Sequence, residues 1–287
     1  MLRNNIKINI DQSEIDALLK YFPEGIVAFD LETTGLSPLL DRIVEISAIK
    51  IGPQIETFHT LINPKIPIPE VTSKIHGLYD DDVKEAPELS HGLQDFLNFV
   101  GKTPLLAHNA QFDAGFLINS LELIEIAFPP INIYCSVKFA RKVFPKKESY
   151  SLGDLSKNLE ITLSSHHQAM DDAYACLKIM LKGLQEPKMN KSVMKDFFLF
   201  SLKDFKSIDP NLDNEVGKEI IKAIKNQKVI EIMYKGGSYK GKFRPIRPLS
   251  ILPLPQGPAV YAHCLLSDLY KFFYLSKITQ TGDIREL

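Results

Sequence analysis

Three short segments of the sequence carry acidic side chains at spacings that could support catalysis. In the first, DLETTG at 30–35, Asp30 and Glu32 are two residues apart, so a β-strand would place both carboxylates on one face. Two carboxylates at that spacing repel each other unless a cation lies between them, and Mg²⁺ prefers oxygen ligands. The segment is equally compatible with a solvated strand end that turns at Gly35.

The second and third segments each place an acid at the predicted start of a helix. HNAQFD at 108–113 ends on Asp113, which a helix cap would explain. HHQAMDDA at 166–173 holds Asp171 and Asp172, and acids in a first helical turn interact favourably with the helix dipole. Neither explanation accounts for the two histidines that precede these acids.

Together, the three segments supply four carboxylates and a histidine, each at a strand end or a helix start, where α/β proteins place functional residues. Such a set is typical of two-metal phosphodiester hydrolysis, in which one metal activates the attacking water and the other stabilises the leaving 3′ oxygen. Asp30 could bridge both metals. A histidine, whose pKa lies near neutral pH, could accept the proton of the water.

The elements that must position these residues alternate between strands and helices. Apolar runs predict strands at 25–30, 42–51, 57–62, 105–107 and 131–134, the first three forming a meander. Helical periodicity predicts helices at 93–100, 113–123, 136–143, 152–159 and 169–184. This order predicts an α/β domain over residues 1–187, in which helices flank a mixed sheet.

The composition excludes several classes of protein. With 45% hydrophobic and 24% charged residues among 287, the chain has the composition of a folded protein. It has no apolar run of about 18 residues, which argues against a membrane-spanning helix, and its first residues lack a signal-peptide core. Its three dispersed cysteines argue against a disulfide framework and a cysteine-rich zinc site, so we expect a cytoplasmic protein without a membrane partner.

The net charge of −1 conceals an asymmetry along the chain. Residues 188–287 contain 17 of the 34 basic but only 10 of the 35 acidic residues, so this part has a net charge of +7 and residues 1–187 have −8. The pattern of residues 190–207 predicts an amphipathic helix within a connector at 188–210. The connector ends at a turn signal. In 211–287, one predicted helix and closely spaced strands indicate a small barrel-like β domain.

The motifs DLETTG, HNAQFD and H-x-A-x-x-D, in this order, resemble those of the DnaQ-like, DEDDh-type 3′–5′ exonucleases, a family that includes the proofreading epsilon subunit of bacterial DNA polymerase III. The resemblance covers roughly residues 24–186 and extends to HTLINP at 59–64, IHGLYDDDV at 75–83 and YSLGDL at 150–155. It implies a ribonuclease H-like mixed five-stranded sheet flanked by helices. It also implies an enzyme that removes nucleoside monophosphates from DNA 3′ ends, in repair or proofreading.

The resemblance also implies roles for individual residues. Two divalent cations, Mg²⁺ or Mn²⁺, would be bound by Asp30, Glu32, Asp113 and Asp172. The family's catalytic histidine lies five residues before its last acid, which selects His167, with His166 as a one-residue alternative and Asp171 solvated or capping the helix. The residues expected to contact the substrate's 3′ end are Thr33, Gly35, Leu36, His76, Asn109 and Phe112. Leu36 and Phe112 could instead be core residues.

The basic part, over roughly residues 213–278, resembles a WYL domain, which is a small SH3-like barrel. Of the Trp-Tyr-Leu triplet that names this domain, only Tyr261 is present. Basic residues interleaved with aromatic ones suit a single-stranded nucleic acid, and the alternative is a solvated β surface with its tyrosines in the core. The residues that we expect to contact nucleic acid are Tyr234, Lys242, Arg244, Arg247, Tyr261, Lys271 and Lys277.

Three functions are compatible with these patterns. The chain could be a DNA exonuclease, acting alone or with a DNA polymerase or repair complex, or an exoribonuclease that trims RNA 3′ ends. It could also be a regulator whose basic part senses nucleic acid or a nucleotide on a vestigial exonuclease fold. A vestigial enzyme would usually have lost an acid, and all five motif positions are intact, which favours an enzyme.

Overall fold

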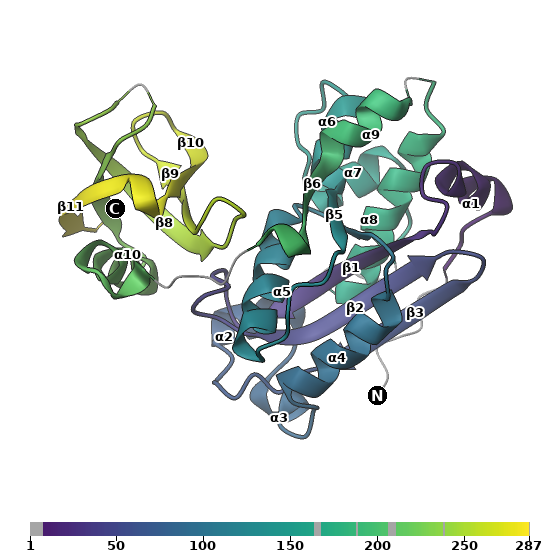
Figure 1. Ribbon diagram of the computed structural model, residues 1–287, viewed down its shortest axis with the longest axis horizontal. Coiled ribbons are helices and arrows are strands. Elements are labelled where there is room, and N and C mark those ends of the chain that lie inside the picture. Colours follow the sequence, from purple (N-terminus) through teal and green to yellow (C-terminus); the bar gives the residue numbers. More distant parts are fainter. Residues whose placement is uncertain (1–7, 164–167, 188, 206–210, 238, 287) are drawn as a thin grey trace. The chain divides into compact units, whose positions relative to one another are not determined.

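The computed structural model describes residues 8–163, 168–187, 189–205, 211–237 and 239–286, and the chain divides into two compact units (Figure 1). The first unit comprises Met1–Gly35 and Arg42–Asp204, and the second comprises Leu36–Asp41 and Phe205–Leu287. Among the described residues, no helix combines the length and the apolar character that crossing a membrane requires.

The first unit is built on a mixed six-stranded sheet with the order β3-β2-β1-β4-β5-β6. Its strands are β1 (Ile26–Thr33), β2 (Ile43–Ile51), β3 (Ile55–Leu61), β4 (Leu105–Ala107), β5 (Asn132–Cys135) and β6 (Phe198–Ser201). The first three strands form the antiparallel meander, β4 pairs parallel with β1, β5 pairs parallel with β4, and β6 returns antiparallel to β5. This mixed pairing places the ends of β1 and β4 at the same edge of the sheet.

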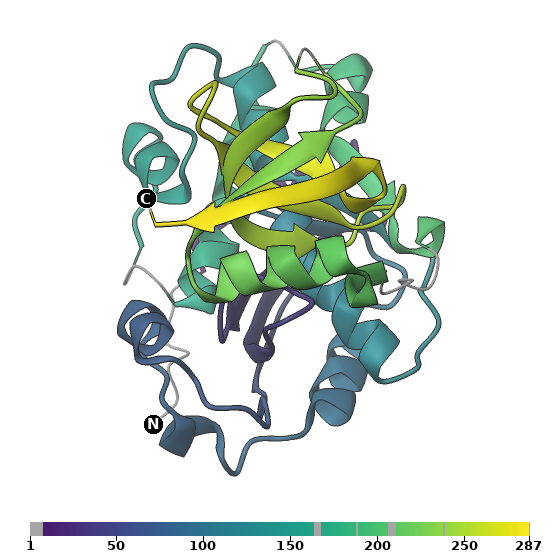
Figure 2. The same cartoon turned by 90° about the vertical axis from the view of Figure 1, so that its left-hand side faces the viewer.

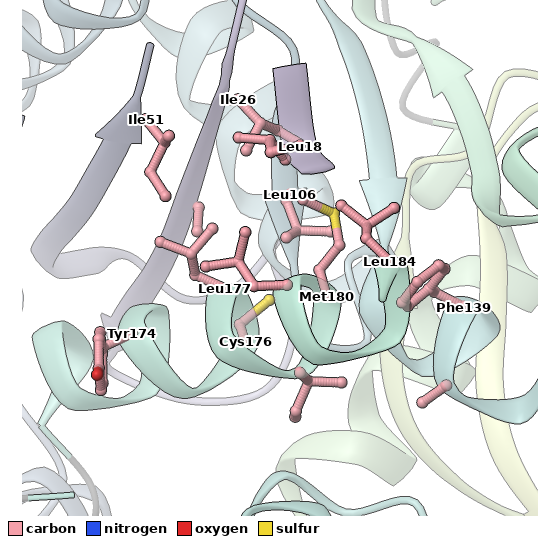
Figure 3. Close-up of a cluster of buried hydrophobic side chains, with 14 of the residues drawn as sticks. Leu18, Ile26, Ile51, Leu106, Phe139, Tyr174, Cys176, Leu177, Met180 and Leu184 are labelled. Atoms are coloured by element: carbon pink, nitrogen blue, oxygen red, sulfur yellow. The ribbon is translucent and has the colours of Figure 1, made fainter. Parts of the chain in front are cut away.

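Helices cover both faces of this sheet. They are α1 (Gln12–Leu19), α2 (Glu70–His76), α3 (Asp80–Val83), α4 (Leu89–Val100), α5 (Gln111–Leu123), α6 (Ser136–Val143), α7 (Leu152–Asn158), α8 (Ala169–Leu184) and α9 (Lys191–Phe197). On one face, Leu177 and Met180 of α8 point toward Ile26 and Leu106 of the sheet (Figure 3). On the other face, Phe29 of β1 contacts a ring of α4, because neighbouring residues of a strand point to opposite faces.

The sheet has one strand more than predicted, and the extra strand comes from the segment expected to be a continuous connector helix. Asn190 caps α9 by accepting from the backbone amides of Ser192 and Val193, but the helix ends at Phe197. Phe198 is extended and pairs with Tyr134 of β5. Edge strands offer unpaired backbone groups, and pairing with β5 satisfies the groups that a longer helix would have bonded internally. Tertiary pairing thus replaced the helix that local periodicity predicted.

The second unit consists of α10 (Glu215–Lys225) and an antiparallel sheet with the order β10-β9-β8-β7-β11. Its strands are β7 (Val229–Tyr234), β8 (Phe243–Leu252), β9 (Ala259–Cys264), β10 (Leu269–Tyr274) and β11 (Ile278–Arg285). Figure 2 shows α10 (green) lying beside the strands of this unit, and its Ile220 and Ala223 are fully buried in the core. The two strands predicted at 242–246 and 249–252 form one strand, β8, whose register shifts between Pro248 and Ser250.

Candidate active site

β1 carries Asp30 and Glu32 on the sheet face that α8 covers. Ile26 and Ala28 of β1 belong to the core cluster that also contains Leu177 of α8. Because side chains alternate along a strand, Asp30 and Glu32 continue the face of Ile26 and Ala28 toward the end of β1. The apolar surface between the sheet and α8 therefore gives way to carboxylates where β1 ends.

Asp113 lies in the first turn of α5, after a short loop that follows β4. Asn109 turns this loop with a left-handed φ of 57°. His108 places Nδ1 2.8 Å from Ser136 Oγ and Nε2 3.0 Å from the carbonyl oxygen of Tyr150. Because a carbonyl only accepts, Nε2 carries the proton and Nδ1 accepts from the hydroxyl. Burial lowers the pKa of His108 to about 4, so a neutral histidine holds the loop that leads to Asp113.

Burial and mutual repulsion raise the pKa values of these acids. Asp113 is 3% exposed, and burial raises its pKa to about 7, although the backbone amides of Asp113 and Leu31 lower it by hydrogen bonding to the carboxylate. The pKa of Asp30 is raised well above its ordinary value, first by burial and then by the negative charges of Asp113, Asp172 and Glu32. The four predicted ligands from β1, α5 and α8 therefore lie close enough to interact electrostatically.

The chemistry of this donor set fits divalent cations. Carboxylates that share a buried site destabilise one another as anions, and a cation with a preference for oxygen ligands offsets that repulsion. Within the described ranges, no three His, Cys, Asp or Glu side chains are already grouped closely enough to hold one ion. The support for a metal site therefore comes from the electrostatic coupling of the acids.

Sequence reasoning missed a fifth acid, Glu45 of β2. It is the register partner of Glu32, it is 3% exposed, and its negative charge also raises the pKa of Asp30. His59 Nε2 lies 2.8 Å from Glu45 Oε1 and so pairs with it beside the other acids. Glu45 could have been found as the one charged residue in the largely apolar run at 43–49. Like charges placed directly opposite in a sheet are unfavourable without compensation, and the contact with His59 supplies part of it for Glu45.

The turn after β1 is held by its own threonines. Thr33 is buried, and its Oγ1 donates to the carbonyl oxygen of Gly35 at 2.6 Å. Thr34 Oγ1 accepts from the backbone amide of Arg42 at 3.0 Å. Leu36 is 58% exposed, so it lies on the surface and the alternative that it is a core residue is wrong. Its exposure leaves it able to contact a ligand.

The remaining predicted substrate residues lie on α2 and around the start of α5. His76, the last residue of α2, is 5% exposed, and its Nδ1 accepts from the backbone amide of Leu78 at 3.0 Å. Thr72 of the same helix places Oγ1 3.4 Å from the carbonyl oxygen of Thr34, which connects α2 to the turn after β1. Asn109 is exposed, and Phe112 is half-buried with its ring stacked obliquely on another ring of α5.

The third motif is described only in part. His166 and His167 lie outside the described residues, so the catalytic histidine remains an expectation. Asp172 lies in the first turn of α8 and is half-buried. Asp171 was expected to be solvated or to cap the helix; it is not solvated, because its side chain is 3% exposed, and the cap position of α8 is Gln168. Tertiary packing buries most residues in the first turns of α8. The position of a residue in a predicted helix does not reveal this burial.

The predicted nucleic-acid contacts of the second unit fall into different environments. Arg244 is 6% exposed, with its guanidinium 5.5 Å from the centre of the Phe273 ring and Nη1 donating to Cys264 Sγ at 3.4 Å. It is therefore an interior residue, contrary to the expectation that it contacts a ligand. Tyr234 also packs on Phe273, at 5.2 Å between ring centres.

The other aromatic and basic candidates are more accessible. Tyr261 stacks on Tyr270 with ring centres 5.8 Å apart, and Arg247, opposite His263 in the register, lies on the same sheet face. Lys271 is opposite the buried Ala262, which places it on the other face. Two further predicted residues, Lys242 and Lys277, lie over tyrosine rings at 5.8 and 5.3 Å.

The sequence and the fold both match known proteins. Residues 27–180 match the RNase_T family model, whose description is Exonuclease. The relatives include the DNA polymerase III PolC-type of Oceanobacillus iheyensis, 36% identical over 166 residues, which are 57% of this chain and 12% of that protein. The PolC-type polymerase of Clostridium perfringens is 31% identical over 275 residues, 93% of this chain and 18% of the relative. The chain thus spans less than a fifth of the length of these relatives.

Solved structures share the fold. Exonuclease I of E. coli, in complex with a dT13 oligonucleotide, superposes with a TM-score of 0.53 at 18% identity, covering 83% of this chain and 55% of that chain. The nuclease domain of 3′hExo, a DEDDh family member bound to rAMP, gives a TM-score of 0.52 at 19% identity, covering 57% of this chain and 93% of its own. At these identities the likeness establishes a common fold.

Proposed function

The chain belongs to the Exonuclease (RNase_T) family, and on this premise we propose that it is a metal-dependent 3′–5′ exonuclease that removes nucleoside monophosphates from DNA 3′ ends. The observation that carries the proposal is the coupling of Asp30 to Asp113, Asp172 and Glu32, whose negative charges raise its pKa. Acids that destabilise one another cost folding free energy, and cation binding accounts for their being placed together.

In the proposed mechanism, Asp30, Glu32, Asp113 and Asp172 would hold two divalent cations, Mg²⁺ or Mn²⁺. These cations would supply positive charge that activates a water and neutralises the phosphate. His167 would accept the proton of the attacking water, since an imidazole titrates near neutral pH. The protein's own contribution is to hold the carboxylates in one partly desolvated site, where their interaction with cations is strong.

Residues beside the acids would position the 3′ end. Thr33 and Gly35 form the turn that directly follows the metal-binding strand, and exposed Leu36 would lie against the last base. Asn109 and Phe112 flank Asp113 in the chain, and His76 lies on the helix that is connected to the turn through Thr72. We propose that these residues bind the terminal nucleotide.

We further propose that the second unit assists nucleic-acid binding and is WYL-like with an SH3-like barrel. The support is the sheet face that carries the stacked rings of Tyr261 and Tyr270 together with Arg247, because stacked aromatics and cations suit single strands. The Clostridium perfringens match extends over 93% of the chain and therefore includes residues of this unit. The relatives are DNA polymerases, which supports a role in proofreading or repair beside a polymerase or repair complex. We propose a cytoplasmic location from the dispersed cysteines alone.

The first experiment measures degradation of a 5′-labelled single-stranded DNA with Mg²⁺, with Mn²⁺ and with EDTA. We expect stepwise shortening from the 3′ end, release of mononucleotides, and no activity in EDTA. Asp30→Asn should lower kcat at least about 100-fold, because several kcal/mol of charge stabilisation would be lost. Asp154→Asn, at an acid of α7 outside the cluster, is the matched control and should retain normal activity. A folded Asp30→Asn variant with normal turnover would refute the assignment.

A second experiment decides the substrate and the histidine. Single-stranded DNA, duplex DNA, duplexes with mismatched 3′ ends and RNA are compared at equal concentration, and the proposal requires DNA to have the highest kcat/KM. Preference for RNA would favour the trimming function. His167→Ala should abolish activity and His166→Ala should retain it, and the reverse result would move the catalytic register by one residue.

A further inference from the structure

The first unit contains a cavity whose lining does not include the acid cluster. It has a volume of about 390 Å³, which is within the range of small-ligand sites. It is lined by Lys20, Tyr21, Tyr134, Lys191, Met194, Lys195 and Phe198. Among the residues that the structure describes, neither a candidate metal ligand nor any other carboxylate lines it.

The walls of this cavity are aromatic rings held by the core. Tyr134 on β5 packs on Phe197 and Phe198, with ring centres 5.1 and 5.6 Å away. Tyr134 is partly buried, and this burial raises the pKa of its hydroxyl, so the side chain is neutral at physiological pH. Tyr21, just after α1, packs partly buried against the same core cluster. The strand β6 supplies Phe198, so the cavity depends on the strand that the sequence did not predict.

The rim of the cavity is positively charged. Lys20, Lys191 and Lys195 are exposed, and no ion pair joins any of them to a carboxylate within the part of the chain that the structure describes. The acid next to Lys195 in the chain, Asp196, instead pairs with Lys142 at 3.1 Å. Three lysines without a carboxylate partner among the described residues give the rim of this cavity a positive charge, and an anion bound there would be attracted electrostatically.

We propose that this cavity binds one nucleotide unit, with its base against the rings of Tyr21, Tyr134 and Phe198 and its phosphate among the ammonium groups of the three lysines. Aromatic rings offer stacking surface to any base, and lysine binds phosphate as a compact point charge. This combination suits a ligand that is both flat and anionic. The nucleotide can be a free nucleoside monophosphate or one unit of a single strand. The site does not require the acid cluster, so it is separate from the proposed hydrolysis.

Binding is tested on the full chain in EDTA, where the proposed hydrolysis does not proceed. Calorimetric titration with dTMP and fluorescence anisotropy with a labelled phosphorothioate oligothymidylate distinguish the two sources of the nucleotide. Lys191→Glu/Lys195→Glu should weaken at least one of the two ligands tenfold or more. Lys84→Glu/Lys157→Glu, which reverses two exposed lysines of the first unit that do not line the cavity, changes the net charge equally and should leave affinity within about twofold.

A second variant tests the aromatic wall without changing charge. Tyr21→Leu keeps an apolar side chain but removes the ring, and it should weaken the same ligand about tenfold. Loss of dTMP binding identifies a free nucleotide, and loss of oligonucleotide binding alone identifies a strand. The proposal is overturned if neither ligand binds, if the Lys191→Glu/Lys195→Glu and Lys84→Glu/Lys157→Glu variants lose affinity equally, or if both cavity variants bind like the parent. Metal-dependent hydrolysis of a dinucleotide by these variants should remain normal, which separates this proposal from the exonuclease assignment.

Discussion

Replacing Asp113 with asparagine should stabilise the metal-free protein at alkaline pH while destroying its metal response. The carboxyl group is 3% exposed and its pKa is raised to about 7 by burial. Between the unfolded pKa of 3.8 and this value, the folded state binds more protons than the unfolded state, so the free energy of unfolding falls as pH rises. Asparagine has nearly the same shape and does not ionise, so the variant lacks this loss.

The magnitude follows from the size of the pKa shift. One pKa unit corresponds to about 1.4 kcal/mol, so a shift from 3.8 to about 7 corresponds to a loss of up to about 4 kcal/mol, complete above pH 7. Asp30 shifts in the same direction and adds to the slope in the parent. The difference in unfolding free energy between variant and parent should therefore move in favour of the variant between pH 4 and pH 8. For a unit of this size, each kcal/mol shifts the Tm by about 2–4 °C.

The assay is differential scanning calorimetry in EDTA at several pH values from 4 to 8, which separates the transitions of the two units. Asp154→Asn is a control with the opposite sign, because hydrogen bonds from Ser149 and Ser151 hold the pKa of Asp154 below its ordinary value. That variant should lose stability above pH 4 and lose nothing below the folded pKa. If the unfolding free energy of Asp113→Asn does not increase relative to the parent between pH 4 and pH 8, the raised pKa of the buried Asp113 carboxyl group is refuted.

Three further predictions follow from the same structure. Saturating Mg²⁺ should raise the Tm of the parent more at pH 8 than at pH 5.5, because the carboxylate ligands must be deprotonated to bind it. Calorimetry of Asp113→Asn should show no such rise. Gly183→Ala would place a Cβ 2.3 Å from Phe139 Cε1 and should cost about 1–3 kcal/mol in urea unfolding, whereas Gly153→Ala, with nothing within 4 Å, should cost nothing. Lys178→Met removes the ion pair with Glu14, in which Nζ lies 2.6 Å from Oε1 and the Glu14 side chain is 7% exposed. The variant should lose about 3–5 kcal/mol of unfolding free energy in urea, because the Glu14 carboxylate is left buried without its partner. A loss below about 1 kcal/mol would contradict a stabilising role for this pair.

Local signals in the sequence were sufficient for the acid motifs and for most of the elements that carry them. Asp30 and Glu32 share one face of a strand because two residues is the repeat of a strand, and the strand is recognisable from the apolar run at 26–29. The start of α5 after β4 and the start of α8 were predicted for the same reason, because each follows from the spacing of nearby apolar residues. Each of these features depends on residues that are near one another in the chain, so the sequence pattern is sufficient to predict it.

Other features depended on residues that are distant in the sequence. β6 forms because β5 offers it an unpaired edge, and Glu45 joins the acids because β2 lies beside β1 in one particular register. Asp171 and Arg244 carry charges that composition alone assigns to the surface, yet packing buries both. No local pattern reports how much of a side chain its neighbours will cover.

The sequence by itself placed carboxylates at the ends of predicted strands and helices, since residue types and their spacing specify them there, and the catalytic chemistry that we propose starts from these residues. The tertiary structure alone decided how strongly these groups interact. The raised pKa of Asp30 comes from burial and from charges on other elements, and the lysine-rimmed cavity comes from α1, β5, α9 and β6 meeting at one edge of the sheet. Desolvation and Coulomb energy depend on distance and on exclusion of water, and both are set only when the chain has folded.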